Sequence, residues 1–353
     1  MGSKAQAQVI VYVAETAVTG HAASILEYDF NASTDAATLE NTIALPGIVG
    51  LSTSSTTTAE PNEGALELSE NGSTLSYAGF NSSHNSVEVQ VNLSNDSVNS
   101  STVDTGDVIR ASFTADGNTV YAATGSLTVA TLPAGVTSTG ATTVTSGGEA
   151  GVSANNIIYN ASLGNIYFSR NSTGAGGVYM ATPSGSGLLT TAQSFTILSG
   201  TGTGWSKSDV YNGMAFLGNN TLFVANTTAN ALDVFVNTTP SSASGWNTQF
   251  TLSLTSNEDI QQVSVDQLDT NDALVFFTTN SGTGGGTSTF DEVSYNSTTG
   301  FGTVNTLENS TTEFYSGIVA IPEPGTYALF GLGLGLIGLM SLRRKAGKEI
   351  CPK

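Results

Sequence analysis

The segment EFYSGIVAIP, residues 313–322, decides the fold because it is a strand without the partners that should follow it. Elsewhere in the chain, a strand of this kind continues through a tight turn into a second strand and then a third. Here the pattern stops at Pro322. The missing second and third strands stand at the other end of the chain, as VIVYVAETA (residues 9–17) and ASILEYDFN (residues 23–31). Joining the two ends would complete the unit and remove an exposed sheet edge.

Complete units of the same kind recur between the ends. Each pairs alternating apolar runs with a turn of Gly, Asn or Asp, residues that accept the positive φ of a two-residue hairpin. The clearest turns are Asn71-Gly72 and Asp116-Gly117. A third strand-like run follows each hairpin, as in SVEVQVNL (86–93). The hairpins are LELSENGSTLSYAGF (66–80), RASFTADGNTVYAAT (110–124), IYNASLGNIYFSRN (158–171), GMAFLGNNTLFVANT (213–227) and VSVDQLDTNDALVFFTTN (263–280).

The spacing of the units predicts the architecture. Successive units begin 43 to 55 residues apart, at Gly64, Asp107, Asn155, Val210, Ile260 and Phe314. A period near 50 residues with about four strands per period is typical of propeller blades. We therefore predict an all-β protein, a six-bladed β-propeller over residues 8–321 that is closed by its two ends. A seven-bladed ring, with the Thr-rich residues 125–150 as a blade of their own, and a β-sandwich are the alternatives.

The composition limits the class of protein. Hydrophobic residues make up 39% of the 353 residues, which is enough for a core, and the formal net charge is −19. A strongly acidic chain is a poor partner for nucleic acid, because phosphate binding depends on Lys and Arg. The one cysteine, Cys351, cannot form an intramolecular disulfide.

A short apolar segment precedes the C-terminus. Residues 327–342 carry no charge and are followed by Arg343, Arg344 and Lys345. As a helix these 16 residues span roughly 24 Å, which is short for a bilayer, so we expect a single transmembrane helix with local thinning and snorkelling cations. The positive-inside rule then leaves residues 346–353 as a cytoplasmic basic tail and the body outside. A buried core helix is the alternative.

The N-terminus bears on export. Ala5-Gln6-Ala7 has the small-x-small pattern found where secretory signals are cut. We expect residues 1–4 to stand in place of a removed signal peptide; a native start is the other interpretation.

Residues 322–345 resemble a known sorting signal. Pro322-Glu323-Pro324, the Gly- and Leu-rich apolar segment and the terminal cations are similar to a PEP-CTERM signal, although the extra tail AGKEICPK departs from the usual ending. The resemblance implies an exosortase-type membrane protease as partner, which would cut near the PEP motif and release or transfer the body. Members of this family are exported by bacteria that make exopolysaccharide and form biofilms.

A second, shorter resemblance concerns catalysis. Residues 212–216 and 219–226 look similar to the blade pattern of gluconolactonase-type propellers, which hold a divalent cation in the central channel. On that resemblance Glu63, Asn212 and Asp266, placed near the starts of inner strands, are candidate ligands for Ca²⁺. The alternative function is thus a calcium-dependent, lactonase-like hydrolase.

The remaining motifs are weaker. His21 and His84 lie near predicted loops without a nucleophile at motif spacing, so we expect no catalytic residue and no cofactor. Sequons accept glycans in some secreted proteins, but a chain rich in Asn, Ser and Thr also produces them by chance. The 13 possible glycosylation sites are Asn31, Asn71, Asn81, Asn92, Asn95, Asn99, Asn160, Asn171, Asn219, Asn226, Asn237, Asn296 and Asn309.

These patterns lead to one expectation for function. We expect an exported, non-enzymatic protein of the cell surface or extracellular matrix. It would begin as an inner-membrane-anchored precursor, and its partners would be a polysaccharide or surface proteins.

Overall fold

The computed structural model describes most of the body as strands and turns. The described residues are 8–17, 20, 22–50, 64–69, 72–102, 109–114, 119–124, 128–133, 142–145, 154–170, 176–181, 196–200, 209–254, 259–269, 271–281 and 287–322. Their strands form five antiparallel sheets. Within these ranges no helix is long and apolar enough to cross a membrane, and the predicted transmembrane segment lies outside them.

Four of the sheets are four-stranded meanders. Each uses the predicted alternation of apolar runs and turns. Their strands are β8 (Ile109–Thr114), β9 (Thr119–Thr124), β10 (Thr128–Pro133) and β11 (Thr142–Thr145); β12 (Ala154–Asn160), β13 (Asn165–Arg170), β14 (Gly177–Ala181) and β15 (Thr196–Ile197); β16 (Tyr211–Leu217), β17 (Thr221–Asn226), β18 (Ala231–Val236) and β19 (Asn247–Ser253); β20 (Asp259–Gln267), β21 (Asp272–Asn280), β22 (Ser288–Asn296) and β23 (Gly300–Ser310).

The fifth sheet has eight strands and joins the two ends of the chain. It combines a meander β24-β1-β2-β3 with a second meander β4-β5-β6-β7, and the two meet where Ile48 and Val49 pair with Asn81 and Phe80. Its strands are β1 (Gln8–Ala17), β2 (Ala22–Asn31), β3 (Ala36–Val49), β4 (Leu66–Leu68), β5 (Thr74–Asn81), β6 (Ser86–Asn92), β7 (Ser97–Thr102) and β24 (Glu313–Pro322).

The predicted pairing of the chain ends is confirmed. Strand β1 lies antiparallel to β24 from Val9 opposite Pro322 to Ala17 opposite Glu313. The last strand of the chain therefore gains the second and third strands that it lacks in the sequence.

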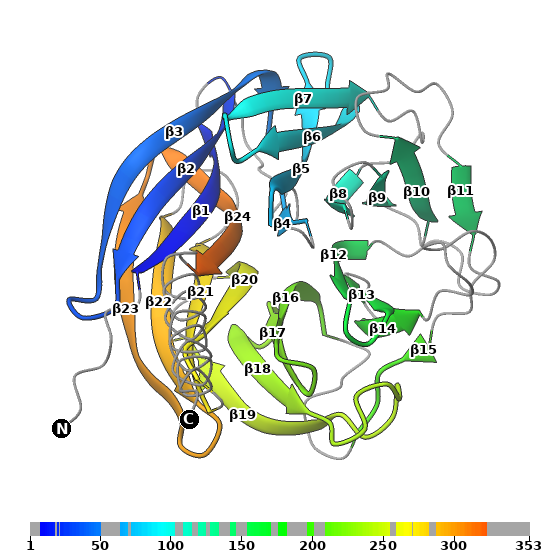
Figure 1. Cartoon of the computed structure of the whole chain (residues 1–353), viewed down its shortest axis with the longest axis vertical. Coiled ribbons are helices and arrows are strands. Elements are labelled where there is room, and N and C mark those ends of the chain that lie inside the picture. The colour runs from blue at the N-terminus through cyan, green and yellow to red at the C-terminus, as the bar shows by residue number, and fades with distance from the viewer. Residues whose placement is uncertain are drawn as a thin grey trace, which may run out of the picture.

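The meanders stand around a central axis (Figure 1). The strand that begins each meander faces this axis: β4, β8, β12, β16, β20 and β24, hereafter the channel strands. Each channel strand contacts the next, and β24 contacts β4, so the contacts close into a cycle. A ring of four-stranded antiparallel sheets is the β-propeller architecture, and such a cycle does not agree with the alternative of a two-layer β-sandwich.

Hydrogen bonds from polar side chains link neighbouring channel strands near their starts. Asn155 Nδ2 donates to the carbonyl of Tyr211 (2.9 Å), Asn212 Nδ2 to that of Ile260 (3.2 Å), and Ser316 Oγ to that of Gly64 (3.1 Å). Each donor lies at an irregularity in the pairing of its own strand. A bulge turns a side chain out of the regular ladder, so the same device recurs in three sheets.

The core fills the spaces between neighbouring sheets. Between the sheet of β1 and that of β20, the rings of Phe30 and Phe276 pack edge to face at 5.0 Å, and Tyr28 lies against Phe290. Between the next two sheets, Phe223 packs on Tyr295 at 4.9 Å. These aromatic layers between the sheets hold the ring together.

A candidate binding site in the central channel

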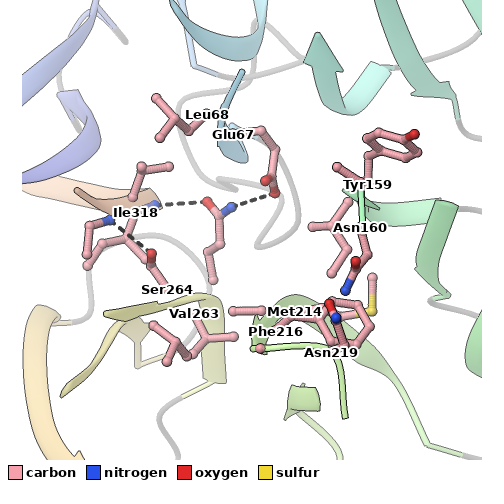
Figure 2. A pocket seen from close by; sticks show the side chains of 18 of the residues that line it. Glu67, Leu68, Tyr159, Asn160, Met214, Phe216, Asn219, Val263, Ser264 and Ile318 are labelled. Carbon is pink, nitrogen blue, oxygen red and sulfur yellow. Dashed lines mark hydrogen bonds between the residues drawn. The ribbon is translucent and has the colours of Figure 1, made fainter. Parts of the chain in front are cut away.

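The channel contains an open cavity of about 410 Å³. Its walls come from five channel strands, β4, β12, β16, β20 and β24, and from the turns that follow β12 and β16 (Figure 2). The cavity therefore lies toward the end of the channel where the channel strands end. Its volume is in the range usual for small-ligand sites.

Of the described residues in the cavity wall, Glu67 is the one that carries an ionisable charge. The short strand β4 places it in the channel, where its Oε1 accepts hydrogen bonds from Asn156 Nδ2 (2.8 Å) and Gln262 Nε2 (3.0 Å). These donors come from β12 and β20, so three sheets converge on one carboxyl group.

Gln262 fixes the position of this group. Its Oε1 accepts from the backbone N–H groups of Leu66 and Ile318, both at 2.9 Å, and its Nε2 also donates to the carbonyl of Leu66 (2.6 Å). A buried amide with every hydrogen-bonding atom in use is rigid, so Gln262 orients Glu67 without being free for a ligand.

Burial governs the protonation of Glu67. It raises the pKa of the Glu67 carboxyl to about 8, against the opposing effect of the two amide hydrogen bonds. At neutral pH the group is therefore mainly the neutral acid, which can donate a hydrogen bond. Next to it, Asn156 Oδ1 is buried and accepts no hydrogen bond from the described part of the chain.

The remaining wall is mixed. Ile158, Met214, Val263 and Ile318 make apolar surface, and Phe216 adds an aromatic face. Among the described residues that line the cavity, amides and hydroxyls are contributed by Asn160, Ser162, Asn219 and Ser264, and none is Lys, Arg or His. This wall suits an uncharged ligand with hydroxyl groups and an apolar face.

Of the predicted metal ligands, the structure describes Asn212 and Asp266, which do not lie together. Asn212 is buried between two sheets and binds the carbonyl of Ile260 at the start of β20. Asp266 is near the end of β20 rather than near its start, six residues from Ile260, or roughly 20 Å along a strand. Glu63 lies outside the described residues. Among those that are described, no three His, Cys, Asp or Glu side chains form a group suited to a metal ion.

The one described histidine, His84, is not among the residues that line the cavity. His84 lies in the turn between β5 and β6, with a φ of 59°, away from the cavity wall, and His21 is outside the described residues.

Most of the described sequons are part of turns. The side-chain carbonyl of Asn31 accepts from the backbone N–H and the hydroxyl of Ser33 (2.9 and 2.7 Å), and Asn92 binds Ser94 in the same way. A backbone N–H two or three residues on is also bound by Asn81, Asn95, Asn160, Asn226, Asn237 and Asn296. Local turn chemistry is thus one role of these asparagines, and it does not test whether they carry glycans.

Three of these asparagines have their amide nitrogen in use. Asn226 Nδ2 donates to Asp209 and Asp233, Asn237 Nδ2 to two backbone carbonyls, and Asn296 Nδ2 to Asp272. A glycan would have to replace these bonds. Glycosylation stays a prediction at all 13 sites. Asn99, Asn219 and Asn309 are exposed, and Asn71 and Asn171 lie outside the described residues.

Sequence reasoning missed the residues that build the site. Asn156 and Gln262 occupy the same place in their units, the second residue of the doublets Asn155-Asn156 and Gln261-Gln262. Two polar amides in succession within an apolar strand were the available signal. Glu67, between two leucines, gave the same signal in the shortest channel strand.

Comparison with known proteins identifies the end of the chain. A family model of the PEP-CTERM protein-sorting motif matches residues 320–345. The chain carries a PEP-CTERM sorting motif. The motif implies an exported protein that is sorted through the membrane and processed by exosortase, a membrane protein. The match begins within β24, so the PEP-CTERM motif follows the body without an intervening domain.

Solved structures similar to the body share its fold at low identity. The periplasmic gluconolactonase of Pseudomonas aeruginosa aligns with a TM-score of 0.53 and 11% identity over 90% of this chain and 100% of its own. A putative 6-phosphogluconolactonase from Bacteroides uniformis gives 0.50 and 12%, over 87% and 84%. The β-propeller domain of Cps50 (Swd1) from Myceliophteria thermophila gives 0.48 and 10%, over 88% of each chain. No curated protein matches the sequence.

Proposed function

We propose that this chain is an exported, exosortase-processed surface protein whose channel binds an uncharged, hydroxyl-rich ligand such as a segment of exopolysaccharide. The body acts by binding and not by catalysis. The observation that carries the proposal is the cavity around Glu67, with its neutral acid, the side-chain amides of Asn160 and Asn219, and no Lys, Arg or His among the described residues that line it.

We infer that the body is a six-bladed propeller. The support is the cycle of contacts through the six channel strands, with β10 and β11 paired into the sheet of β8 and β9. Residues 128–133 and 142–145, the described part of the segment that suggested a seventh blade, then belong to an existing sheet. The sixth blade is built from both ends of the chain, which ties the sorting motif to a folded body.

The chemistry of the cavity favours sugars over acidic metabolites. Hydroxyl groups of a neutral sugar would accept from protonated Glu67 and donate to the exposed side-chain amide oxygen of Asn219, while the ring would lie on Phe216. An anionic ligand would meet a strongly acidic protein without a balancing cation. The calcium-dependent lactonase remains the second candidate, on the similarity of fold alone.

The pH dependence of binding tests the role of Glu67. With neutral oligosaccharides prepared from the host's exopolysaccharide, calorimetry should detect binding at pH 6.5 that weakens roughly tenfold by pH 9, since the carboxylate cannot donate a hydrogen bond. Glu67→Gln retains a donor at every pH, so its affinity should not fall. Phe216→Ala should weaken binding at both pH values.

Two outcomes would contradict the proposal. The first is the absence of binding by the intact body at any pH. The second is lactone hydrolysis that is lost on chelation and restored by Ca²⁺, which would favour the enzyme. Mass spectrometry of the protein from its native host would test the sorting part separately, because it reports the mature C-terminus.

A further inference from the structure

Strand β24 has two roles in the same few residues. Ile318, Val319 and Ala320 form part of the cavity wall, and the strand ends two residues later at Pro322. The sorting motif begins within this strand. The wall of the cavity and the start of the sorting signal are therefore continuous.

The chain leaves the body at the end of the channel on which the cavity lies. The turns that follow β12 and β16, including Ser162 and Asn219, line the cavity, so it lies where these channel strands end. The final residues of β24 line it as well. Strand β20 fixes this end of β24, because Ser264 Oγ accepts from the backbone N–H of Ala320 (2.9 Å).

The connection to the apolar segment is short. Four residues, 323–326, separate the end of β24 from Tyr327, where the uncharged segment begins. An extended chain spans at most about 3.6 Å per Cα–Cα step, so the five steps from Pro322 to Tyr327 reach roughly 18 Å. A body held by such a link would keep that end of its channel close to the bilayer.

We infer that in the membrane-tethered precursor the cavity faces the bilayer, and that removal of the sorting segment uncovers it for polymeric ligands. The inference rests on the proposed function, since it takes the apolar segment as a membrane anchor and a polysaccharide as the ligand. Small molecules reach the cavity in both states, whereas a polymer reaches it only after processing. Sorting then controls when the protein binds as well as where it resides.

Two cysteine variants of the same sheet test this orientation. Asn219→Cys lies at the cavity, and Ala229→Cys lies in the β17–β18 turn, near the start of β16, where Thr227 N–H bonds the carbonyl of Val210. Both residues are exposed, and both variants carry Cys351→Ser so that each has one thiol. The full chain is inserted into phosphatidylcholine–phosphatidylglycerol vesicles, and a site for a specific protease between residues 323 and 326 allows release.

The readout is the rate of labelling by a 5-kDa polyethylene-glycol maleimide and by a small maleimide. The large reagent should label Asn219→Cys at least fivefold more slowly before release than after it, and Ala229→Cys equally in both states. The small reagent should label both sites in both states. Labelling of Ala229→Cys also measures the fraction of bodies that face outward.

The outcomes separate the two claims. If the chain floats with the vesicles but the large reagent labels Asn219→Cys equally before and after release, the inference is wrong and the proposed function stands. If the chain does not float with the vesicles, the membrane anchor fails, and the inference fails with it.

Discussion

Glu67 is a carboxyl group whose protonation depends on the folded ring. Its partners Asn156 and Gln262 are 89 and 195 residues away in the sequence, so the site exists only when the sheets are in place. Burial raises the pKa of Glu67 to about 8. Between the ordinary pKa of a glutamate, near 4.3, and this value, the folded state holds a proton that the unfolded state has lost.

The stability of the body should therefore fall as pH rises through this window. The contribution of Glu67 is fully favourable below its ordinary pKa and declines by up to about 1.4 kcal/mol per pH unit until pH reaches about 8. Glu67→Gln removes this titration and keeps an oxygen for Asn156 and Gln262. In urea unfolding at pH 5, 7 and 9, the variant should gain stability over the parent as pH rises.

Exposed Glu40 supplies the matched control, because Glu40→Gln makes the same chemical change outside the channel. It should leave the pH slope unchanged. A Glu67→Gln variant with the slope of the parent would show that the channel does not hold the carboxyl in its neutral form.

At the scale of the element, the channel strands approach one another more closely than side chains allow. A Cβ atom on Gly213 of β16 would lie 2.4 Å from Gln262 Cα and 2.8 Å from Val263 N, which are backbone atoms of β20. Gly317 of β24 is in the same situation, 2.6 Å from the carbonyl oxygen of Gly64. Glycine at these positions sets the distance between sheets, and with it the geometry around Gln262.

Gly213→Ala should therefore destabilise the body by about 2 kcal/mol or more, because a backbone cannot rotate away as a side chain can. It should also disturb Gln262 and lower the affinity of the cavity. Thermal unfolding and ligand titration would measure the two effects together.

Gly302→Ala in β23 is the comparison. There the added Cβ meets mainly the Ser294 hydroxyl, at 2.3 Å, and the next atoms are at 3.6 Å. A rotation of Ser294 relieves this contact, and alanine is no worse than glycine in a strand. Equal losses in the two variants would mean that the close approach of β16 and β20 is not what requires glycine.

At the scale of the whole molecule, the sequence predicted the parts that repeat. The period near 50 residues, turns such as Asn71-Gly72 and the complementary ends predicted the meanders and their closure. Contacts between sheets could not be predicted in this way. The alternation of apolar and polar residues along a strand does not say which residue of another sheet Asn156 or Asn212 will contact. The join of Ile48 and Val49 to β5 was also missed, because nothing local distinguishes an outer strand that continues into the next sheet.

Because β24 closes the ring, the body should not fold without this strand. A chain that ends at Pro322 keeps β24 and should unfold in one cooperative transition as a monomer. A chain that ends at Ser310 leaves the apolar edge of β1 unpaired and removes buried Tyr315, Ile318 and Val319. Each buried side chain of this kind contributes about 1.5 to 3 kcal/mol, and a domain has only about 5 to 15 kcal/mol in total, so the shorter chain should aggregate or remain unfolded.

A peptide of residues 311–322 provides the decisive measurement on the shorter chain, since an exposed edge can accept a strand from a second molecule. Added during refolding, the peptide should bind the shorter chain in a 1:1 complex. This complex should have the far-ultraviolet circular dichroism spectrum of the longer chain. The same peptide with Gly317→Ala should fail, because its Cβ would lie 2.6 Å from the carbonyl oxygen of Gly64 and 2.7 Å from Leu66 N. Equal refolding with both peptides would mean that pairing with the edge of β1 is enough to stabilise the body. Refolding with the unmodified peptide alone would mean that β24 must also pack against β4 to close the ring.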